Sequence, residues 1–288
     1  MKLALGTAQF GLDYGVANTT GQIHAEVAAA ILNRARSLGV SVLDTAIAYG
    51  NSETVLGSLG TTDFDIITKL PGHAEDEDDL GTWVDMQIEQ SFGRLGVDAA
   101  YGVLLHRPAQ LLAAHGNKLF DALLRLKAEG RVSKIGISIY DPEELEALNG
   151  RFAFDLIQAP MNIIDRRLVT SGWADQLKAD GVEIHTRSAF LQGLLLMPKQ
   201  ARPAKFTPWA PIWNEWERWL LASALTPTEA CIRYVSNVAQ VDRVVVGVDS
   251  VAQLEEIAGA IGAPLNDWPD FLDVADLRFL NPALWSQL

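Results

Sequence analysis

The sequence predicts a (β/α)8 TIM barrel, with a long loop after the seventh strand. Eight short apolar segments rich in β-branched residues alternate with eight segments of helical period, and no change of composition interrupts the alternation. The length of 288 residues suits one such barrel, so we expect a single domain over residues 1–288. The first glycine-containing stretch, GTAQFGLDYG, is not a G-x-G-x-x-G fingerprint, which disfavours an open, doubly wound dinucleotide-binding sheet.

The expected strands are short and apolar, and each ends before a polar or glycine-containing loop. They are Lys2–Leu5, Val40–Leu43, Phe64–Thr68, Tyr101–Leu105, Lys134–Ile137, Phe154–Gln158, Val182–Thr186 and Arg243–Val246. The expected helices are amphipathic, and several are followed by glycine or preceded by an Asp-Pro or Thr-Pro pair. They are Ala25–Leu38, Glu53–Leu59, Trp83–Leu95, Lys118–Glu129, Pro142–Leu148, Val169–Ala179, Pro227–Val238 and Val251–Ile261.

One stretch, Met197–Leu225, breaks this rhythm. It carries four tryptophans and four prolines and is longer than a connection between a strand and a helix requires. We expect it to help form the substrate pocket. The alternative is a separate hydrophobic cluster packed on the barrel wall.

Composition excludes several classes of function. The formal net charge of −13 argues against binding to nucleic acid or to an anionic membrane surface. No apolar run is long enough to span a bilayer. The single cysteine, Cys231, cannot form an internal disulfide and fits a reducing cytoplasm. The five histidines are scattered, so we expect no metal site.

Four polar residues fall at the carboxyl ends of consecutive predicted strands or in the loops that follow, where barrel enzymes carry their chemistry. Asp44 and Tyr49 follow the second strand, Lys69 ends the third and His106 ends the fourth. A tyrosine donates a proton poorly unless its phenolate is stabilised, and a neighbouring ammonium such as Lys69 can do this. Asp44 would balance that buried charge, and His106 would orient a substrate oxygen.

Each of these residues alone has an ordinary structural explanation: a loop carboxylate, a loop aromatic, a strand-end lysine or a buried core histidine. Their occurrence together at neighbouring strand ends favours a site. The group describes a general acid for carbonyl reduction, with the hydride coming from a cofactor.

At these residues the sequence resembles the aldo/keto reductase superfamily, from Leu3 to about Ile261. The matching stretches are LGTAQFG, LDTAIAYGNSETVLG, ITK, FGRLGVDAAYGVLLH, IGIS, QAPMN and RSAFLQGLL. The resemblance implies that Asp44, Tyr49, Lys69 and His106 form the proton-donor tetrad. It also implies an NADP(H) or NAD(H) cofactor and a small-molecule carbonyl substrate.

The resemblance further implies which residues hold the cofactor. Ser138 and Gln158 would bind the nicotinamide carboxamide, and Asn162 would be a polar neighbour. The remaining expected cofactor-binding residues lie at the ends of the first, seventh and eighth strands. They are Gly6, Thr7, Arg187, Ser188, Gly247, Asp249, Ser250 and Gln253.

The chain departs from the family pattern at three places. Ile139 stands where asparagine is common after the serine, and Arg187 stands where an aromatic ring often stacks on the nicotinamide. After the eighth strand the chain has Asp249 and no basic residue, where the family commonly binds the 2′-phosphate of NADP(H) with cations. A carboxylate there repels that phosphate, so we expect NAD(H) to bind at least comparably.

Two other functions remain open at this point. Lys69 could form a Schiff base in a lyase or isomerase, with Tyr49 and His106 as acid and base. A non-catalytic, cofactor-binding regulatory barrel is the third possibility, although it would not require all four polar groups. The stretches YGNSE and FLQGLLL are similar to those of bacterial members associated with surface-polysaccharide sugar pathways, which implies a sugar-derived carbonyl.

Overall fold

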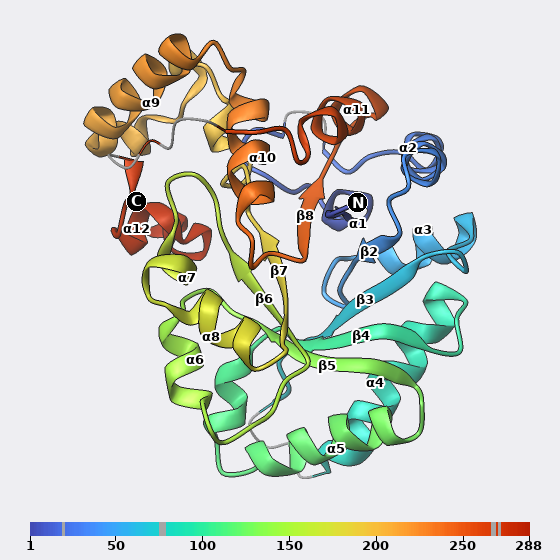
Figure 1. Cartoon of the computed structure of the whole chain (residues 1–288). Coiled ribbons are helices and arrows are strands. Elements are labelled where there is room, and N and C mark those ends of the chain that lie inside the picture. Colours follow the sequence, from blue (N-terminus) through green and yellow to red (C-terminus); the bar gives the residue numbers. More distant parts are fainter. Residues whose placement is uncertain (19–20, 75–78, 266–268, 270–271) are drawn as a thin grey trace.

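The computed structural model describes residues 1–18, 21–74, 79–265, 269 and 272–288. Eight parallel strands follow one another around a closed barrel, and β8 pairs with β1 to complete it (Figure 1). The strands are β1 (Leu3–Gly6), β2 (Val42–Asp44), β3 (Asp65–Leu70), β4 (Ala100–Leu105), β5 (Val132–Ser138), β6 (Leu156–Pro160), β7 (Glu183–Arg187) and β8 (Arg243–Gly247). The predicted (β/α)8 barrel is therefore confirmed, with every expected strand present.

Helices surround the strands on the outside of the barrel (Figure 1). The α-helices are α1 (Ala8–Gly11), α2 (Ala25–Ser37), α3 (Ser52–Leu59), α4 (Leu80–Leu95), α5 (Gly116–Ala128), α6 (Glu143–Leu148), α7 (Arg167–Thr170), α8 (Trp173–Ala179), α9 (Ala210–Ser223), α10 (Pro227–Asn237), α11 (Val251–Ala260) and α12 (Leu277–Leu280). The 3₁₀ helices are η1 (Pro108–Leu112), η2 (Leu194–Leu196), η3 (Lys199–Ala201), η4 (Ala204–Trp209) and η6 (Pro282–Gln287).

Local sequence explains where helices begin and end. Thr226 and Glu229 form a reciprocal capping box at the start of α10, with Pro227 at its first position. The helix expected over Val169–Ala179 is instead divided into α7 and α8. Gly172 lies between them with φ of 83°, a backbone conformation that glycine adopts without strain.

The long loop expected over Met197–Leu225 contains more structure than predicted. Two 3₁₀ turns lead into α9, a helix of 14 residues that buries three of the tryptophans. Figure 1 shows α9 at the edge of the molecule, close to α12 and the C-terminus. The tryptophans therefore lie on a separate helical layer that is added to the barrel.

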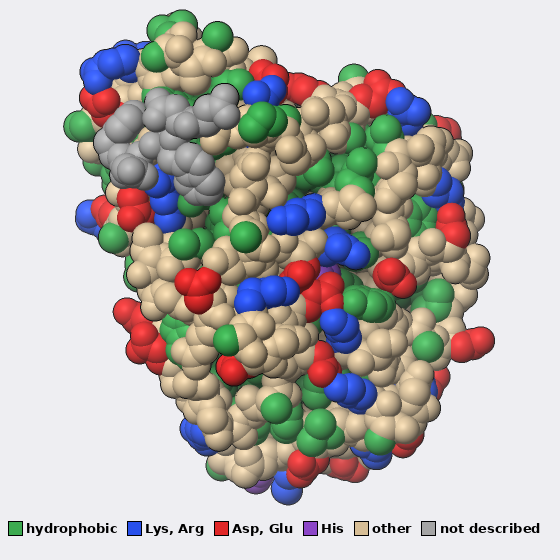
Figure 2. Space-filling model, in the orientation of Figure 1, with side chains coloured by type: hydrophobic (Ala, Val, Ile, Leu, Met, Phe, Trp, Pro, Cys, Tyr) green, Lys and Arg blue, Asp and Glu red, His purple; other side chains and the backbone are tan. Residues whose placement is uncertain are grey.

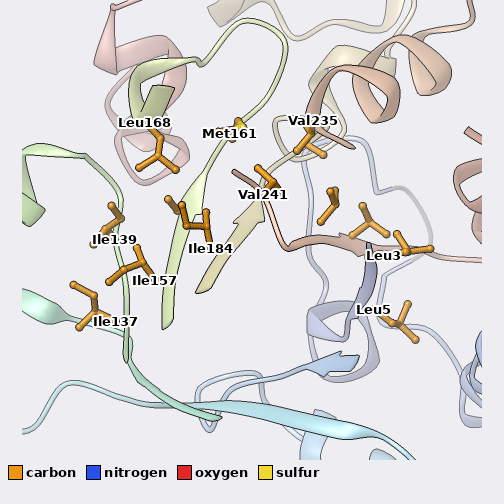
Figure 3. Close-up of a cluster of buried hydrophobic side chains, with 14 of the residues drawn as sticks. Leu3, Leu5, Ile137, Ile139, Ile157, Met161, Leu168, Ile184, Val235 and Val241 are labelled. Atoms are coloured by element: carbon orange, nitrogen blue, oxygen red, sulfur yellow. The ribbon is translucent and has the colours of Figure 1, made fainter. Parts of the chain in front are cut away.

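The core lies in two places because side chains alternate between the faces of each strand. Outward-facing residues such as Leu5, Ile137 and Ile184 pack beneath the helices in the larger cluster (Figure 3). A smaller cluster fills the inside of the barrel. It consists of Ala4, Val42, Ile67, Leu104, Leu156 and Val245. The barrel is thus closed by apolar side chains, and any chemistry must take place above this plug.

Acidic and basic side chains are interspersed over much of the face in Figure 2. Among the described helices, none is both long enough and apolar enough to cross a membrane.

Candidate active site

The polar residues predicted from the strand ends lie directly above the apolar plug. Because inward-facing positions recur every second residue, a side chain two positions after a plug residue also points inward, nearer the carboxyl end. The pairs are Val42 and Asp44, Ile67 and Lys69, Leu104 and His106, and Leu156 and Gln158. The alternation of side chains along each strand therefore places both the apolar plug and the polar residues of the site inside the barrel.

Asp44 and Lys69 form a buried ion pair at the centre of this layer. Lys69 Nζ donates to Asp44 Oδ1 over 2.6 Å and to the Thr45 carbonyl over 2.8 Å. The Lys69 side chain is completely inaccessible to solvent. Burial lowers the pKa of Lys69, and the Asp44 carboxylate acts in the opposite direction. The predicted pairing of these two groups is present in the structure.

Gln158 and Ser138 extend this pair into a hydrogen-bonded chain. Gln158 Nε2 donates to Asp44 Oδ2 over 2.6 Å, and Ser138 Oγ donates to Gln158 Oε1 over 3.1 Å. Both oxygens of Asp44 are therefore engaged. Ser138 and Gln158, expected to bind the cofactor carboxamide, are bonded to each other and to Asp44.

Tyr49 lies beside His106 and above Lys69. The Tyr49 and His106 rings meet edge to face with centroids 5.9 Å apart, and Lys69 Nζ lies 5.1 Å from the centre of the Tyr49 ring. Burial raises the pKa of Tyr49, and the Asp44 carboxylate adds to the effect. The cation that acts in the opposite direction is Arg187. The expected lowering of this pKa by Lys69 is not found, because Asp44 balances the Lys69 charge.

His106 is neutral at physiological pH. Burial lowers its pKa to about 4, and the positive charges of Lys69 and Arg187 contribute further. A neutral imidazole keeps one N–H donor and one acceptor nitrogen. His106 can therefore donate a hydrogen bond to a carbonyl oxygen without supplying a proton.

A cavity of about 360 Å³ runs from Tyr49 and Asp44 toward the first turns of α11. It is bordered by the ends of β1, β7 and β8. Nine of the predicted site residues line it: Gly6, Thr7, Asp44, Tyr49, Arg187, Ser188, Gly247, Asp249 and Gln253. Lys69, His106, Ser138, Gln158 and Ser250 do not line the cavity.

Several residues expected to bind the cofactor have structural partners. The Ser250 hydroxyl caps α11 by accepting the Gln253 N–H over 3.2 Å, while Gln253 Oε1 accepts the Asp249 N–H over 2.7 Å. Thr7 Oγ1 donates to the Asp44 carbonyl over 3.0 Å. Asn162 Nδ2 donates to the Ser188 carbonyl over 3.2 Å and so holds the loop after β7. These residues shape the walls of the cavity.

At the α11 end of the cavity, one carboxylate oxygen of Asp249 lacks a hydrogen-bond partner among the described residues. This atom, Oδ1, is buried. Burial raises the pKa of this carboxyl group. The Asp249 side chain also lines the cavity, and rotation of its carboxylate would turn this oxygen toward a ligand hydroxyl.

Sequence reasoning missed part of the lining. Gln9, Tyr14, Gln192 and Glu256 also line the cavity. Two of these had a detectable signal: Tyr14 lies in the loop after the first strand, and Glu256 follows Gln253 by three positions, on the same side of α11. Gln9 had no such signal in the sequence, because the position of its side chain depends on the absence of a side chain at Gly247, at the end of β8. A Cβ atom on Gly247 would lie 2.3 Å from the Gln9 side-chain amide.

The tryptophan-rich segment does not contribute to this cavity, so its predicted role in the pocket is wrong for the cavity observed here. Trp209 stacks on Phe279 with ring centroids 4.9 Å apart, and its Nε1 atom donates to Asp276 over 3.2 Å. Phe206 meets Trp285 edge to face at 4.8 Å. The segment packs against the C-terminal helices because its large rings bury more surface there than a solvated loop would allow.

Comparison with known proteins agrees with this geometry. The aldo/keto reductase family matches residues 2–268. An uncharacterized oxidoreductase of Schizosaccharomyces pombe is 32% identical over 124 residues, which are 40% of this chain and 43% of that protein. L-galactose dehydrogenase of Arabidopsis thaliana is 25% identical over 266 residues, 84% of this chain and 80% of the relative. The matches to the first three curated relatives span only about two fifths of their length.

Solved structures share the fold. An aldo-keto reductase from Bacillus halodurans superposes with a TM-score of 0.74 at 21% identity, covering 95% of this chain and 92% of the other. The glycerol dehydrogenase of Gluconobacter oxydans superposes with a TM-score of 0.71 at 20% identity, covering 98% of this chain and 92% of the other. With the family match over residues 2–268, these findings show that the chain belongs to the aldo/keto reductase family of oxidoreductases.

Proposed function

We propose that this protein reduces an aldehyde or ketone with a nicotinamide cofactor, and that Tyr49 gives the proton to the carbonyl oxygen. The observation that carries the proposal is the position of Tyr49. It lines the cavity while a buried Asp44–Lys69 pair and a neutral His106 lie directly against it. The bound cofactor would supply the hydride.

The residues along the cavity fit such a cofactor. Gly6 and Gly247 line the cavity at the ends of β1 and β8, and the missing Cβ of Gly247 leaves room for the amide of Gln9, which also lines it. The Asp249 carboxylate, which lines the cavity, fits a ribose hydroxyl better than a phosphate, because two negative groups repel. We therefore propose Asp249 and Gln253 as contacts to the adenosine half of NAD(H), and the β7 end with Arg187 and Ser188 as the neighbourhood of the nicotinamide.

Each catalytic residue would act through a specific atom. The Tyr49 hydroxyl would pass its proton to the carbonyl oxygen as the carbonyl carbon accepts the hydride, and the phenolate would then regain a proton from water. Arg187 would stabilise that phenolate by its charge, and Lys69 would support the site as the partner of Asp44. His106 would donate its N–H to the same carbonyl oxygen and fix its direction. Asp44 would hold Lys69 in place.

The Schiff-base alternative is disfavoured. Lys69 does not line the cavity, its side chain is inaccessible, and its ammonium is committed to Asp44 and Thr45. A nucleophilic amine needs access to a carbonyl carbon and a free lone pair. Lys69 has neither.

A sugar-derived carbonyl is the substrate class that we propose. Two proteins similar to this chain are named for a sugar and for a polyol, L-galactose and glycerol. The cavity also combines tyrosine, glutamine and carboxylate side chains that hydroxyl groups can bond.

The test is a screen of NADH and NADPH oxidation over aldehydes, keto-sugars and nucleotide sugars, with wild type and Tyr49→Phe. We expect carbonyl-dependent oxidation in wild type. Loss of about 10²–10⁴-fold in kcat is expected in the variant, with cofactor affinity unchanged. Turnover retained by Tyr49→Phe would remove Tyr49 from the mechanism.

A further inference from the structure

Arg187, at the carboxyl end of β7, stands out among the residues of the cavity. It is the one basic side chain among the described residues that line it. Arg187 Nη2 donates to the Ile139 carbonyl over 2.9 Å, Nη1 lies 3.3 Å from Ser188 Oγ, and the guanidinium lies 4.5 Å from the centre of the Tyr140 ring. The side chain is therefore held in one place by neutral groups.

Among the residues that the structure describes, no carboxylate pairs with this cation. In the described part of the chain Arg187 forms no ion pair, whereas Lys69 below it is matched by Asp44. A guanidinium has five N–H donors, and two of its nitrogens each make one contact here. Several donors thus stay available, in a protein whose net charge is −13.

Charge is distributed unevenly along the cavity. The α11 end has the carboxylates of Asp249 and Glu256, and the Tyr49 end has Arg187 together with Asp44, whose charge is balanced by Lys69 beneath it. His106 is neutral at physiological pH, so it adds nothing to the charge at that end. An anion is therefore favoured at the end where the proton donor lies and disfavoured at the other.

We propose that Arg187 binds a carboxylate on the substrate, so that the protein reduces an aldehyde or ketone that also carries an acid group. The planar fork of arginine matches a carboxylate with two parallel hydrogen bonds. This inference rests on the proposed carbonyl reduction and adds an acid group to its substrate, which a uronic acid combines with the sugar-derived carbonyl.

The anion belongs to the substrate because Arg187 acts on the reacting groups. Its charge lowers the pKa of both Tyr49 and His106, so it lies within electrostatic range of the hydroxyl that must reach the carbonyl oxygen. An acid group held there is a few bonds from the reacting carbon. A short keto acid, an acid semialdehyde or a uronic acid satisfies this spacing.

The experiment compares matched pairs of carbonyl compounds that differ in the anionic group. The pairs are succinic semialdehyde and butanal, D-glucuronate and D-glucose, and glyceraldehyde 3-phosphate and glyceraldehyde. Wild type should have the higher kcat/KM for the carboxylates, and in Arg187→Met the ratio of kcat/KM between the acid and the uncharged member of each pair should fall by about 10- to 100-fold, beyond any loss that both members share. Arg187→Lys should recover part of the loss, since it restores the charge without the fork. A preference confined to the phosphate would overturn the assignment to a carboxylate.

Two measurements make the outcome decisive. NADH affinity is measured by fluorescence for wild type and Arg187→Met. Weaker NADH binding by the variant, together with an unchanged preference for acids, would show that Arg187 binds the nucleotide instead of the substrate. Calorimetric binding of 4-hydroxybutyrate does not require turnover, so it tests the anion site even if carbonyl reduction fails. Equal binding by both proteins would refute the proposal. Arg218 is an exposed arginine on α9, so Arg218→Met is the matched control. It should change neither the preference for acids nor the binding of 4-hydroxybutyrate.

Discussion

Lys69 Nζ and Asp44 Oδ1 lie 2.6 Å apart inside the barrel, and neither side chain is accessible enough for water to replace its partner. Removing one member leaves the other charge buried and unpaired, which costs far more than the pair itself contributes. The position also explains why Lys69 does not lower the pKa of Tyr49. The Asp44 carboxylate raises the pKa of Tyr49 and offsets the charge of the Lys69 ammonium paired with it.

Lys69→Met should therefore destabilise the fold as well as the chemistry. We expect a loss of about 3–5 kcal/mol in the free energy of unfolding, measured by urea denaturation. The double variant Lys69→Met with Asp44→Asn should recover part of that loss, because it no longer contains an unpaired carboxylate. Additive losses in the two single variants and the double variant would contradict the pairing.

His106 predicts a pH dependence of stability. Its pKa falls from 6.5 to about 4 on folding, so the unfolded chain binds the proton more tightly in that interval. The contribution is fully present above pH 6.5 and is lost as the pH falls toward 4. The difference of 6.5 − 4 = 2.5 pKa units corresponds to about 3 kcal/mol.

The comparison is between wild type and His106→Gln, unfolded with urea at pH 7.5 and at pH 4.5. The variant lacks the group that takes up a proton on unfolding, so its stability should fall less between the two pH values. Parallel losses in both proteins would mean that His106 is not the titrating group.

Trp209→Ala tests the packing of the aromatic segment. The ring is buried, stacked on Phe279 and bonded to Asp276, and no residue of this segment lines the cavity. We expect about 3–5 kcal/mol of destabilisation with an unchanged KM for the substrate. Leu221→Ala, 84% exposed on α9, is the control and should alter neither. A raised KM with a normal melting temperature would place the segment in the substrate pocket after all.

The strands and the central pair could be predicted because each depends on a local pattern. A period of two fixes which strand residues point inward, so Asp44 and Lys69 follow from Val42 and Ile67. Contacts that depend on tertiary packing could not be predicted from the sequence. Gln158 reaches Asp44 across 114 positions in the sequence, and Trp213 of α9 finds its partner, Phe279, in the C-terminal helix α12. Hydrophobic composition showed that the α9 segment must be buried, but not against which surface.

Asp249 and the choice of cofactor give the last prediction. Two carboxylates, Asp249 and Glu256, line the α11 end of the cavity, and no basic side chain lines that end among the described residues. A 2′-phosphate placed there would meet unbalanced negative charge, whereas the free ribose hydroxyls of NADH could donate to the Asp249 carboxylate. We expect NADH to bind at least as tightly as NADPH. Asp249→Asn should strengthen the binding of NADPH by about tenfold, equivalent to ~1.4 kcal/mol, while the affinity for NADH changes little or falls.

Fluorescence titration of both reduced cofactors at low salt measures these constants, because salt screens the repulsion that is being tested. Asp121→Asn, on the exposed side of α5, removes the same charge far from the cavity and should leave both constants unchanged. The prediction is specific in sign: removal of one carboxylate must favour the phosphorylated cofactor over the other. If wild type binds NADPH more than tenfold tighter than NADH, a cation outside the α11 end must reach the phosphate, and the charge argument fails.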